Sequence, residues 1–430
     1  MDQTAGIWSH CLDVAALSDI GLRRANNQDS YTVVLAGSED DFRQRGHVLM
    51  VADGMGGHAA GELASKMATD IVSLDYRKLL DQTPAEAILS AVLDANHQIH
   101  VRGQASPEFR GMGTTSTILV LLPGGALVAH VGDSRCYRVR GQRIEQLTFD
   151  HSYVWEMQAA GQMPEGGIPG FISKSSITRS LGPHATEQVD LEGPHAVQAG
   201  DTFVLCSDGL SNQVKDEEIG LVLNCLPPAE AVHALIELAC LRGGPDNITA
   251  VVARVLGPQV PETADAAPSQ RSDRSNVRPV DPKLWTLLGV ASLATLGLAA
   301  LQQWWLFVVG LTVAAAALVT VLVKRYGGGS KPESDHRHFG RGPYVAVDCT
   351  AKAEHLAVFA DIVRQLRDAA TEEQWSVDYR AVDQHLTQAA TATKGGNLTA
   401  AASGYLRAII VLMAQLREQR SASSDSSVFL

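Results

Sequence analysis

Short apolar runs rich in β-branched residues alternate with stretches of helical spacing between residues 11 and 256. The runs that predict strands are bounded by Gly, Pro or Asp and cover residues 48–52, 115–122, 126–131 and 202–206. Residues 62–80 and 84–101 carry apolar side chains at helical intervals, and Thr83 is a candidate N-cap for the second helix. Turn sequences at Pro123-Gly124-Gly125 and Arg140-Gly141-Gln142 join consecutive strands. This order predicts an α+β sandwich rather than a βαβ array.

The pattern changes after residue 256. Residues 257–283 are rich in Pro, Ser, Asp and Ala without periodicity, which predicts a disordered linker. Residues 284–323 contain no charged side chain, and one bilayer crossing takes about twenty residues. The prediction is a two-helix transmembrane hairpin that turns at 302–305, with Trp304 and Trp305 at the far interface. The stretch is too long for a single tilted membrane helix. A buried hairpin of this length in a soluble protein would be unusual.

Basic residues flank both outer ends of this apolar stretch. They are Arg278 and Lys283 before it and Lys324 and Arg325 after it, and none lies in the turn. By the positive-inside rule both ends are expected in the cytoplasm.

The C-terminal part returns to helical patterning. Residues 324–343 form a spacer rich in Gly, Ser and charge, and residues 344–420 predict a small all-α bundle of about three amphipathic helices. The stretch 389–417 resembles one helix-pair unit of repeat or MIT-like interaction modules, although such spacing is also typical of a helix that buries its own core. We expect a helical interaction domain here, followed by a frayed tail at 421–430.

Composition and charge narrow the function classes. The chain has 430 residues, of which 45% are hydrophobic, and a formal net charge of -12. An acidic balance argues against nucleic acid as a partner, because phosphate backbones are bound by clustered Lys and Arg. The six cysteines contain no C-x-x-C pair, which favours free thiols in a reducing cytoplasm. The N-terminal residues lack the basic and apolar regions of a secretory signal peptide, so none is expected.

Aspartates recur at the edges of the predicted strands. They are Asp29, Asp53, Asp133, Asp208 and Asp246. Gathering five carboxylates at strand edges is costly unless cations neutralise them, and Mg²⁺ and Mn²⁺ favour oxygen ligands of this kind. Glycines crowd the sequence around Asp53, and we expect them to clear space for ions and substrate. A lone Asp before Gly is more often a turn or an N-cap, so the prediction rests on the whole set.

Seven motifs occur in one order along residues 11–256: RRANNQD, VADGMGGHAAGE, GMGTTS, VGDSR, LTFDHS, LCSDGL and GGPDNIT. This order resembles the metal-dependent PP2C-type (PPM) serine/threonine phosphatase family in its bacterial form. The resemblance implies a β-sandwich flanked by helices, with a binuclear metal site at one edge. It also implies a phosphoric monoester hydrolase that cleaves phosphoserine and phosphothreonine with a metal-activated water.

The same resemblance assigns roles to the aspartates. It implies that Asp53 bridges two Mn²⁺ or Mg²⁺ ions and that Gly54 contributes its carbonyl oxygen. Asp208 and Asp246 would complete the shell of the second ion. Asp29 would hold a metal-bound water.

The resemblance also assigns roles to Asp133 and Arg24, while at Met55 the sequence departs from the family pattern. Asp133 would help to bind a third, weaker ion, and Arg24 would grip the substrate phosphate through its guanidinium fork. Met55 stands where eukaryotic members carry a histidine thought to protonate the leaving group. His58, His151 or water are the candidates for that acid.

Residues 153–180 occupy the family's flap position. Their glycines and prolines indicate either a mobile loop that gates the substrate or an ordinary surface loop.

The expected protein is therefore membrane-anchored. The resemblance implies phosphoserine and phosphothreonine proteins as substrates, and serine/threonine kinases and their targets as partners. Together with the basic flanks it places the chain in a bacterial inner membrane, multi-pass, with the catalytic and C-terminal domains cytoplasmic. The rival hypothesis is a catalytically inactive membrane-bound scaffold or sensor. Cysteine-dependent phosphatase and Walker A motifs are absent from the sequence.

Overall fold

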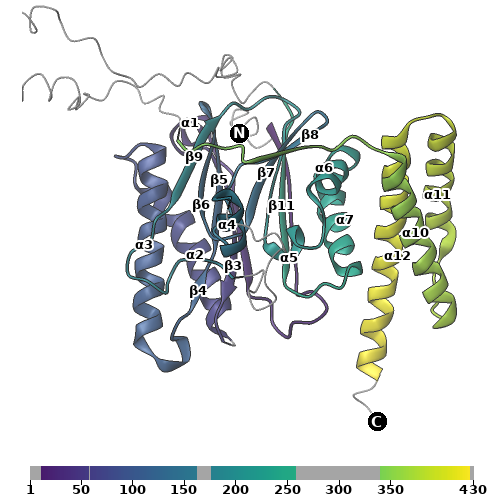
Figure 1. Ribbon diagram of the computed structural model, residues 1–430, viewed down its shortest axis with the longest axis horizontal. Helices are drawn as coiled ribbons and strands as arrows, with labels where there is room; N and C mark the ends of the chain where they lie inside the picture. Colours follow the sequence, from purple (N-terminus) through teal and green to yellow (C-terminus); the bar gives the residue numbers. More distant parts are fainter. Residues whose placement is uncertain (1–10, 58, 162–175, 258–338, 427–430) are drawn as a thin grey trace, which may run out of the picture. The chain divides into compact units, whose positions relative to one another are not determined.

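Two antiparallel sheets stack face to face in the computed structural model, which describes residues 11–57, 59–161, 176–257 and 339–426 (Figure 1). In order across the first sheet stand β1 (Leu12–Asp19), β11 (Ile248–Val255), β10 (Thr202–Cys206), β7 (Arg135–Arg140), β8 (Arg143–Gln146) and β12 (Val345–Asp348). The second runs β2 (Asp29–Val34), β3 (His47–Met55), β5 (Ser116–Leu122), β6 (Gly125–Val131) and β9 (Asp190–His195), with β4 (Gly113–Thr114) paired to β3.

Alternating apolar side chains from both sheets fill the space between them, as expected for a sandwich. They include Leu49, Val51, Leu119, Leu121, Phe203, Leu205 and Val251, all buried. The sandwich fold and the strands expected at 48–52, 126–131 and 202–206 are therefore confirmed. The strand expected at 115–122 is also confirmed, as β5, which begins one residue later at Ser116.

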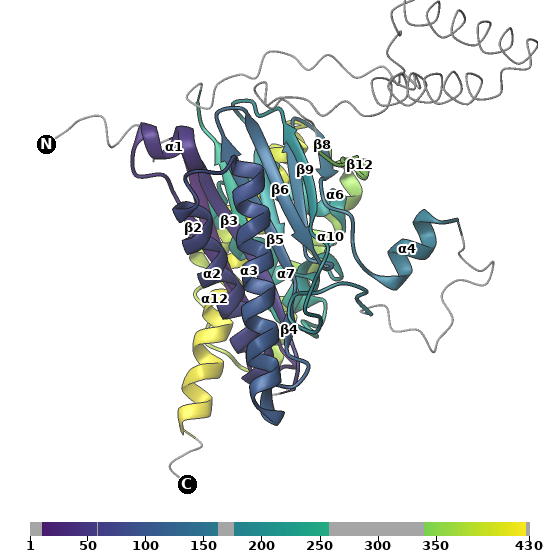
Figure 2. The same cartoon turned by 90° about the vertical axis from the view of Figure 1, so that its left-hand side faces the viewer.

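Helices cover both outer faces of the sandwich. The second sheet is covered by α2 (Ala59–Lys78) and α3 (Pro84–Ala105), which lie across it in Figure 2. The first sheet is covered by α6 (Asp216–Cys225) and α7 (Pro228–Leu241). Short helices complete the set: α1 (Glu39–Arg45), η2 (Pro107–Phe109), α4 (Tyr153–Ala159) and α5 (Asp208–Ser211).

The predicted N-cap of α3 is confirmed. The Thr83 hydroxyl accepts the backbone N–H of Glu86 at 3.3 Å, and the Glu86 carboxylate accepts that of Thr83 at 3.0 Å. This capping box satisfies two N–H groups that a helix start leaves without partners.

The three expected C-terminal helices are α10 (Ala353–Glu372), α11 (Tyr379–Lys394) and α12 (Leu398–Ser426). They belong, with the other described residues from 339 on, to one compact unit that also contains the preceding sandwich. One apolar core runs from the first sheet through α6 and α7 into these helices and includes Phe359, Val382 and Leu406. The segment is thus built onto the sandwich.

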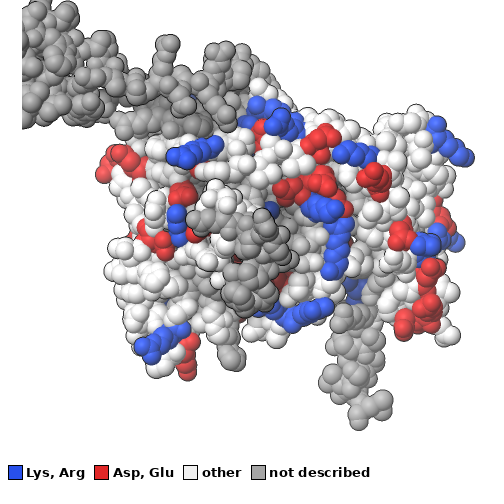
Figure 3. Space-filling model, in the orientation of Figure 1, with Lys and Arg blue, Asp and Glu red and all other residues white. Residues whose placement is uncertain are grey.

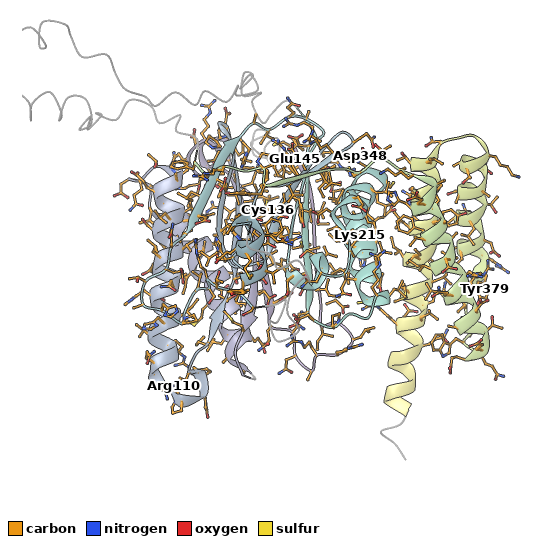
Figure 4. All side chains as sticks on the ribbon, viewed as in Figure 1. Arg110, Cys136, Glu145, Lys215, Asp348 and Tyr379 are labelled. Carbon is orange, nitrogen blue, oxygen red and sulfur yellow. The ribbon has the colours of Figure 1, made fainter. Side chains whose placement is uncertain are left out.

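β12 makes this attachment at the sheet edge. It pairs with β8 in antiparallel register, Val345 opposite Gln146 and Asp348 opposite Arg143. Glu145 on β8 stands opposite Ala346 of β12 in this register, and Figure 4 labels Glu145 and Asp348 on the two paired strands. On the face shown in Figure 3, acidic and basic side chains are intermixed rather than gathered in one field of a single sign.

The predicted membrane hairpin at 284–323 and its linker from residue 258 lie outside the described residues. The frayed tail predicted at 421–430 is wrong for residues 421–426, because α12 continues to Ser426, while residues 427–430 lie outside the described ranges. Within the described ranges, one helical stretch, Leu398–Gln419 of α12, is long and apolar enough to cross a membrane by length and composition. Its residues Leu406, Ile409 and Leu412 are buried in the core shared with α6 and α7. Packing within the fold accounts for the apolar character of this helix.

Candidate active site

Strand ends from both sheets bring the predicted aspartates to one place. Asp29 begins β2 and stands directly opposite Asp53 of β3 in the antiparallel register. Asp208 follows β10 and begins α5, and Asp246 lies two residues before β11. Asp133 follows β6 after Gly132. The fold therefore converts five positions spread over the sequence into one cluster.

A pocket of about 230 Å³ lies at this end of the sandwich. It is lined by Arg24, Gln28, Asp53, Gly54, Met55, Gly56, Thr115, Asp133, Ile177, Asp208 and Asp246. Four of the five predicted aspartates line it. Asp29 lies beneath it, 8% exposed, and faces Asp53 across the strand pair.

Asp29 is held by hydroxyl groups from the neighbouring sheet. Its Oδ2 accepts hydrogen bonds from Thr249 Oγ1 at 2.7 Å and Ser207 Oγ at 2.8 Å. Ser207 in turn accepts the backbone N–H of Thr249 at 2.9 Å. These bonds fix one oxygen of the carboxylate and leave the other to face the cluster.

The peptide of Asp53 is held as firmly as the Asp29 side chain. Its N–H donates to Thr115 Oγ1 at 2.8 Å, and its carbonyl accepts the Thr115 N–H and the Thr114 hydroxyl, both at 2.9 Å. The Thr115 hydroxyl also lies 2.9 Å from that of Ser134, next to Asp133. The threonines of the GMGTTS motif thus set the orientation of the predicted bridging aspartate.

Burial and mutual repulsion make the carboxylates reluctant to ionise. Burial is the largest cause of the raised pKa at Asp29, which is about 7, at Asp133, about 8, and at Asp208, about 6. Burial also raises the pKa of Asp53 well above its usual range. Four neighbouring charges add to that rise, namely those of Asp29, Asp208, Asp133 and Asp246. Positive charge bound at the cluster would therefore stabilise the ionised carboxylates.

Two buried oxygens test whether divalent cations suit this place. Asp29 Oδ1 and Asp208 Oδ1 are buried and have no hydrogen-bond partner among the described residues. Buried carboxylate oxygens normally have partners, and oxygen-rich donor sets suit Mg²⁺ and Mn²⁺. Across the described residues no three acidic, histidine or cysteine side chains converge on one point as a ready-made ligand group. Mg²⁺ sites commonly use one or two carboxylates and several waters, so the cluster fits the ions.

Arg24 lies at the mouth of the pocket, where its role was predicted. Its Nη2 donates to Asp246 Oδ2 at 2.7 Å, and its side chain is 46% exposed. The guanidinium is therefore anchored by one predicted ligand while it stays accessible to an anion that enters from solvent.

Of the two histidines considered as the catalytic acid, the structure describes one. His58 lies outside the described residues. His151 is fully buried: its Nδ1 accepts the Gly132 N–H at 3.0 Å, and its Nε2 lies 2.9 Å from Asp190 Oδ2. With both ring nitrogens bonded inside the fold, His151 supports the structure around Asp133 and does not line the pocket.

Gly54, next to Asp53, has another role than the expected one. A Cβ at Gly54 would stand 2.1 Å from the carbonyl oxygen of Gly61 in α2 and 2.5 Å from that of Gln28. Gly54 is required because α2 packs against β3 at contact distance. Space for ions and substrate is not what its missing side chain provides, so the prediction was wrong for Gly54. It stays a prediction for Gly56, which lines the pocket.

Sequence reasoning missed the residues that organise the loops. Asn247 Nδ2 donates to the carbonyls of Ile20 and Asn26 at 2.9 and 3.0 Å, and its Oδ1 accepts the Gln28 N–H at 2.8 Å. Asking which groups satisfy the lone pairs of Asp29 would have pointed to the hydroxyls of Ser207, just before Asp208, and Thr249, three residues after Asp246. The predicted flap begins with α4, and residues 162–175 of it lie outside the described ranges.

Comparison with known proteins agrees with this geometry. The family model for protein phosphatase 2C matches residues 23–238. Over 249 residues, 57% of this chain, the sequence is 39% identical to the serine/threonine protein phosphatase PstP of Mycobacterium tuberculosis, but this covers 45% of that relative. The chain thus spans less than half the length of PstP. It is 36% identical to protein phosphatase PhpP of Streptococcus pneumoniae over 55% of this chain and 95% of the relative.

Solved structures extend the comparison. The serine/threonine phosphatase of S. agalactiae is 35% identical, with a TM-score of 0.50, over 57% of this chain and 99% of that one. The catalytic domain of PstP, solved in complex with 2 manganese ions, is 37% identical with a TM-score of 0.48 over the same shares. The sandwich, the pocket of aspartates and the sequence matches agree, and the chain belongs to the protein phosphatase 2C family.

Proposed function

We propose that this chain is a metal-dependent serine/threonine protein phosphatase that hydrolyses phosphoserine and phosphothreonine in proteins. The observation that carries the proposal is the pocket in which buried, mutually repelling carboxylates stand beside an accessible guanidinium. Such a pocket attracts divalent cations, and cations with an arginine attract a phosphoryl group. Family membership supplies the reaction class.

The proposed ligands of two Mn²⁺ or Mg²⁺ ions are Asp53, the Gly54 carbonyl, Asp208 and Asp246, with Asp133 toward a third ion. When bound, the ions would supply Lewis acidity, which polarises the phosphoryl oxygens and acidifies water. Asp29 Oδ1, which has no partner among the described residues, would accept a hydrogen bond from water at the cluster.

The chain's own residues then position the phosphate. Arg24 presents N–H groups in a planar fork that matches two phosphoryl oxygens, and its bond to Asp246 holds it at the pocket mouth. Hydrogen bonds from the Thr249 and Ser207 hydroxyls fix the Asp29 carboxylate, and the bond from the Asp53 N–H to the Thr115 hydroxyl fixes the backbone at Asp53. No nucleophilic side chain is required, because water attacks the phosphorus directly. His58 and water are the remaining candidates for the acid that protonates the leaving oxygen.

The substrate class is tested with peptides. In Mn²⁺, the full chain should release inorganic phosphate from phosphothreonine and phosphoserine peptides, and EDTA should abolish the release. The full chain is the appropriate material because α10 to α12 share their core with the sandwich. A folded chain that releases no phosphate in Mn²⁺ or Mg²⁺ would leave the rival hypothesis, an inactive scaffold or sensor.

We further propose that residues 284–323 anchor the protein in a bacterial inner membrane as a two-helix hairpin, with the catalytic and C-terminal parts in the cytoplasm. The absence of charge over this stretch and the basic residues at both its ends support the proposal. Membrane-bound serine/threonine kinases and their substrates would then be close partners, because tethering raises local concentration.

Membrane insertion predicts a simple fractionation result. The full chain should stay in the membrane pellet after an alkaline carbonate wash and dissolve only in detergent. Leu296→Arg with Leu318→Arg places one charge in each proposed helix, at about 3 kcal/mol each, and should move protein to the supernatant. Wild-type chain released by carbonate alone would contradict the anchor.

A further inference from the structure

Arg417 of the C-terminal helix α12 binds two acidic side chains that are distant from it in the sequence. Arg417 of α12 forms an ion pair through Nη1 with Asp19, the last residue of β1. Its Nη2 donates to Glu237 Oε2 of α7 at 3.0 Å and to Cys240 Sγ at 3.5 Å. The side chains of Asp19 and Glu237 are only 17% and 9% exposed. The guanidinium thus joins α12, α7 and the end of β1.

Removing the Arg417 guanidinium would take its positive charge away from the largely buried carboxylates of Asp19 and Glu237. Burial raises the pKa of Glu237, the charge of Arg417 lowers it and the charge of Asp19 raises it. The acids therefore lie close enough to repel each other, and the arginine offsets that repulsion. Since breaking a buried pair leaves an uncompensated charge, the local structure would move to rehydrate it.

Asp19 connects this cluster to the loop that carries Arg24. Its Oδ1 accepts the backbone N–H of Gly21 at 2.8 Å. Gly21 has φ of 77°, and a Cβ there would stand 2.1 Å from the carbonyl oxygen of Asp246. The next residue, Leu22, donates its N–H to the carbonyl of Gly244 at 2.8 Å. The loop after β1 is therefore pressed directly against the peptides that precede and include Asp246.

The two loops form one bonded unit. Asn247 binds the carbonyls of Ile20 and Asn26 and the N–H of Gln28, so residues 20–28 are tied to the 242–247 loop at both ends. Arg24 reaches Asp246 across this junction at 2.7 Å.

Arg417 contacts the two segments that lead into the 20–28 loop and the 242–247 loop. Asp19 leads into the first loop, while Glu237 and Cys240 stand in the last part of α7, which ends at Leu241 and leads into the second. Displacement of α12 would release both loops together.

We infer that Arg417 is a positioning residue for the proposed phosphatase: acting through Asp19 and α7, it fixes the loops that set Arg24 against Asp246. The inference rests on the proposed function for its kinetic consequence and on geometry for its structural one. The family match ends at residue 238, so α12 lies beyond it. The C-terminal helix would thus be an addition on which the phosphate grip of this chain depends.

Arg407 offers a matched control. It also lies on α12 and pairs with α7, its Nε donating to Glu230 Oε2 at 2.6 Å, and it is 36% exposed against 41% for Arg417. Glu230 stands in the first turn of α7, at the other end from the 242–247 loop. Arg407→Met should loosen α12 only where it meets the first turn of α7 and should leave the Arg417 contacts, and with them the loops, in place.

Hydrogen exchange on the full chain, without substrate, is the direct test. Arg417→Met should speed amide exchange in peptides covering 19–28 and 242–247, while Arg407→Met should match wild type there. Arg417→Lys, which keeps the charge, should restore part of the protection. Equal exchange in these peptides for Arg417→Met and Arg407→Met would overturn the inference.

Kinetics supply the functional arm. With a phosphothreonine peptide in Mn²⁺, Arg417→Met should raise KM by about fivefold or more and leave kcat within about twofold, because the phosphate grip is displaced. A partly unfolded preparation would instead lower kcat and leave KM unchanged. Asp19→Asn combined with Arg417→Met should be no worse than the more impaired single variant, since both act on one contact. Additive effects, or a KM equal to that of Arg407→Met, would contradict the inference.

The two arms separate the inference from the function beneath it. If the wild-type chain hydrolyses no phosphopeptide, the proposed function fails with the kinetic claim, and the exchange result alone decides whether Arg417 fixes the loops. If the wild type is active and Arg417→Met behaves as Arg407→Met in both arms, the inference fails and the function stands.

Discussion

Replacing Asp53 with asparagine is expected to lower kcat/KM for a phosphothreonine peptide in Mn²⁺ by at least about a thousandfold. Asp53 lines the pocket, stands opposite Asp29 in the strand pairing, and is repelled by the charges of Asp208, Asp133 and Asp246. An amide keeps the shape but removes the negative charge on which binding of both proposed ions depends. The measurement is initial-rate kinetics on the full chain with saturating Mn²⁺.

The same substitution should have the opposite effect on the stability of the metal-free chain. Burial and neighbouring carboxylates disfavour the charge on Asp53, so the neutral amide should leave the chain as stable as wild type or more stable, by about 1 kcal/mol, near pH 8. Asp94→Asn, the same change on the exposed surface of α3, serves as the control and should alter neither property. An Asp53→Asn chain that keeps a tenth of wild-type activity would refute the role given to Asp53.

Without metal, the chain is expected to lose about 1.5 kcal/mol of stability between pH 7 and pH 8.5. The folded-state pKa of Asp29 is about 7 and that of Asp133 about 8, and both exceed the unfolded value of about 3.9. A raised folded pKa means that the fold favours the protonated form. This contribution is fully present below about pH 4 and is lost as pH rises through the folded pKa values.

The window avoids an opposing effect from histidines. Burial lowers the pKa of His47 to about 4 and that of His130 to about 3. Their contribution grows as pH rises toward the unfolded value of about 6.5 and is nearly complete by pH 7. Above pH 7 the carboxylates should therefore dominate.

Divalent metal should reverse the trend in the same window. Mg²⁺ binds the ionised carboxylates, and a concentration a hundredfold above Kd adds about 2.7 kcal/mol. Urea unfolding of the full chain at pH 7 and pH 8.5, with EDTA or with Mg²⁺, measures both effects. Metal-free stability that rises over this window would show that the carboxylates are not held in mutual repulsion.

The strand ends and their aspartates could be predicted because the signal is local. An apolar run that ends in Asp is visible in a few residues, and the antiparallel pairing that sets Asp29 opposite Asp53 follows from the sandwich. The order of the motifs then supplied the family. Local pattern also predicted the three C-terminal helices, although α12 continues to Ser426, beyond the predicted start of the tail.

Contacts between distant segments could not be predicted in this way. The four residues of β12 are too few to signal a strand, and the pairing with β8 gives them their place. Amphipathic spacing shows that α12 has an apolar face, but not that this face packs against α6 and α7. The pair of Arg417 with Asp19 joins residues 398 positions apart, and no local pattern encodes it.

The most direct test of the metal-dependent reaction combines metal content and hydrolysis in one titration. The full chain would be stripped with EDTA and dialysed, then titrated with Mn²⁺ while bound manganese and phosphate release from a phosphothreonine peptide are measured in the same samples. The account predicts no hydrolysis by the stripped chain and activity that rises as two ions are taken up. Hydrolysis by the stripped chain at the rate of the loaded one would contradict it.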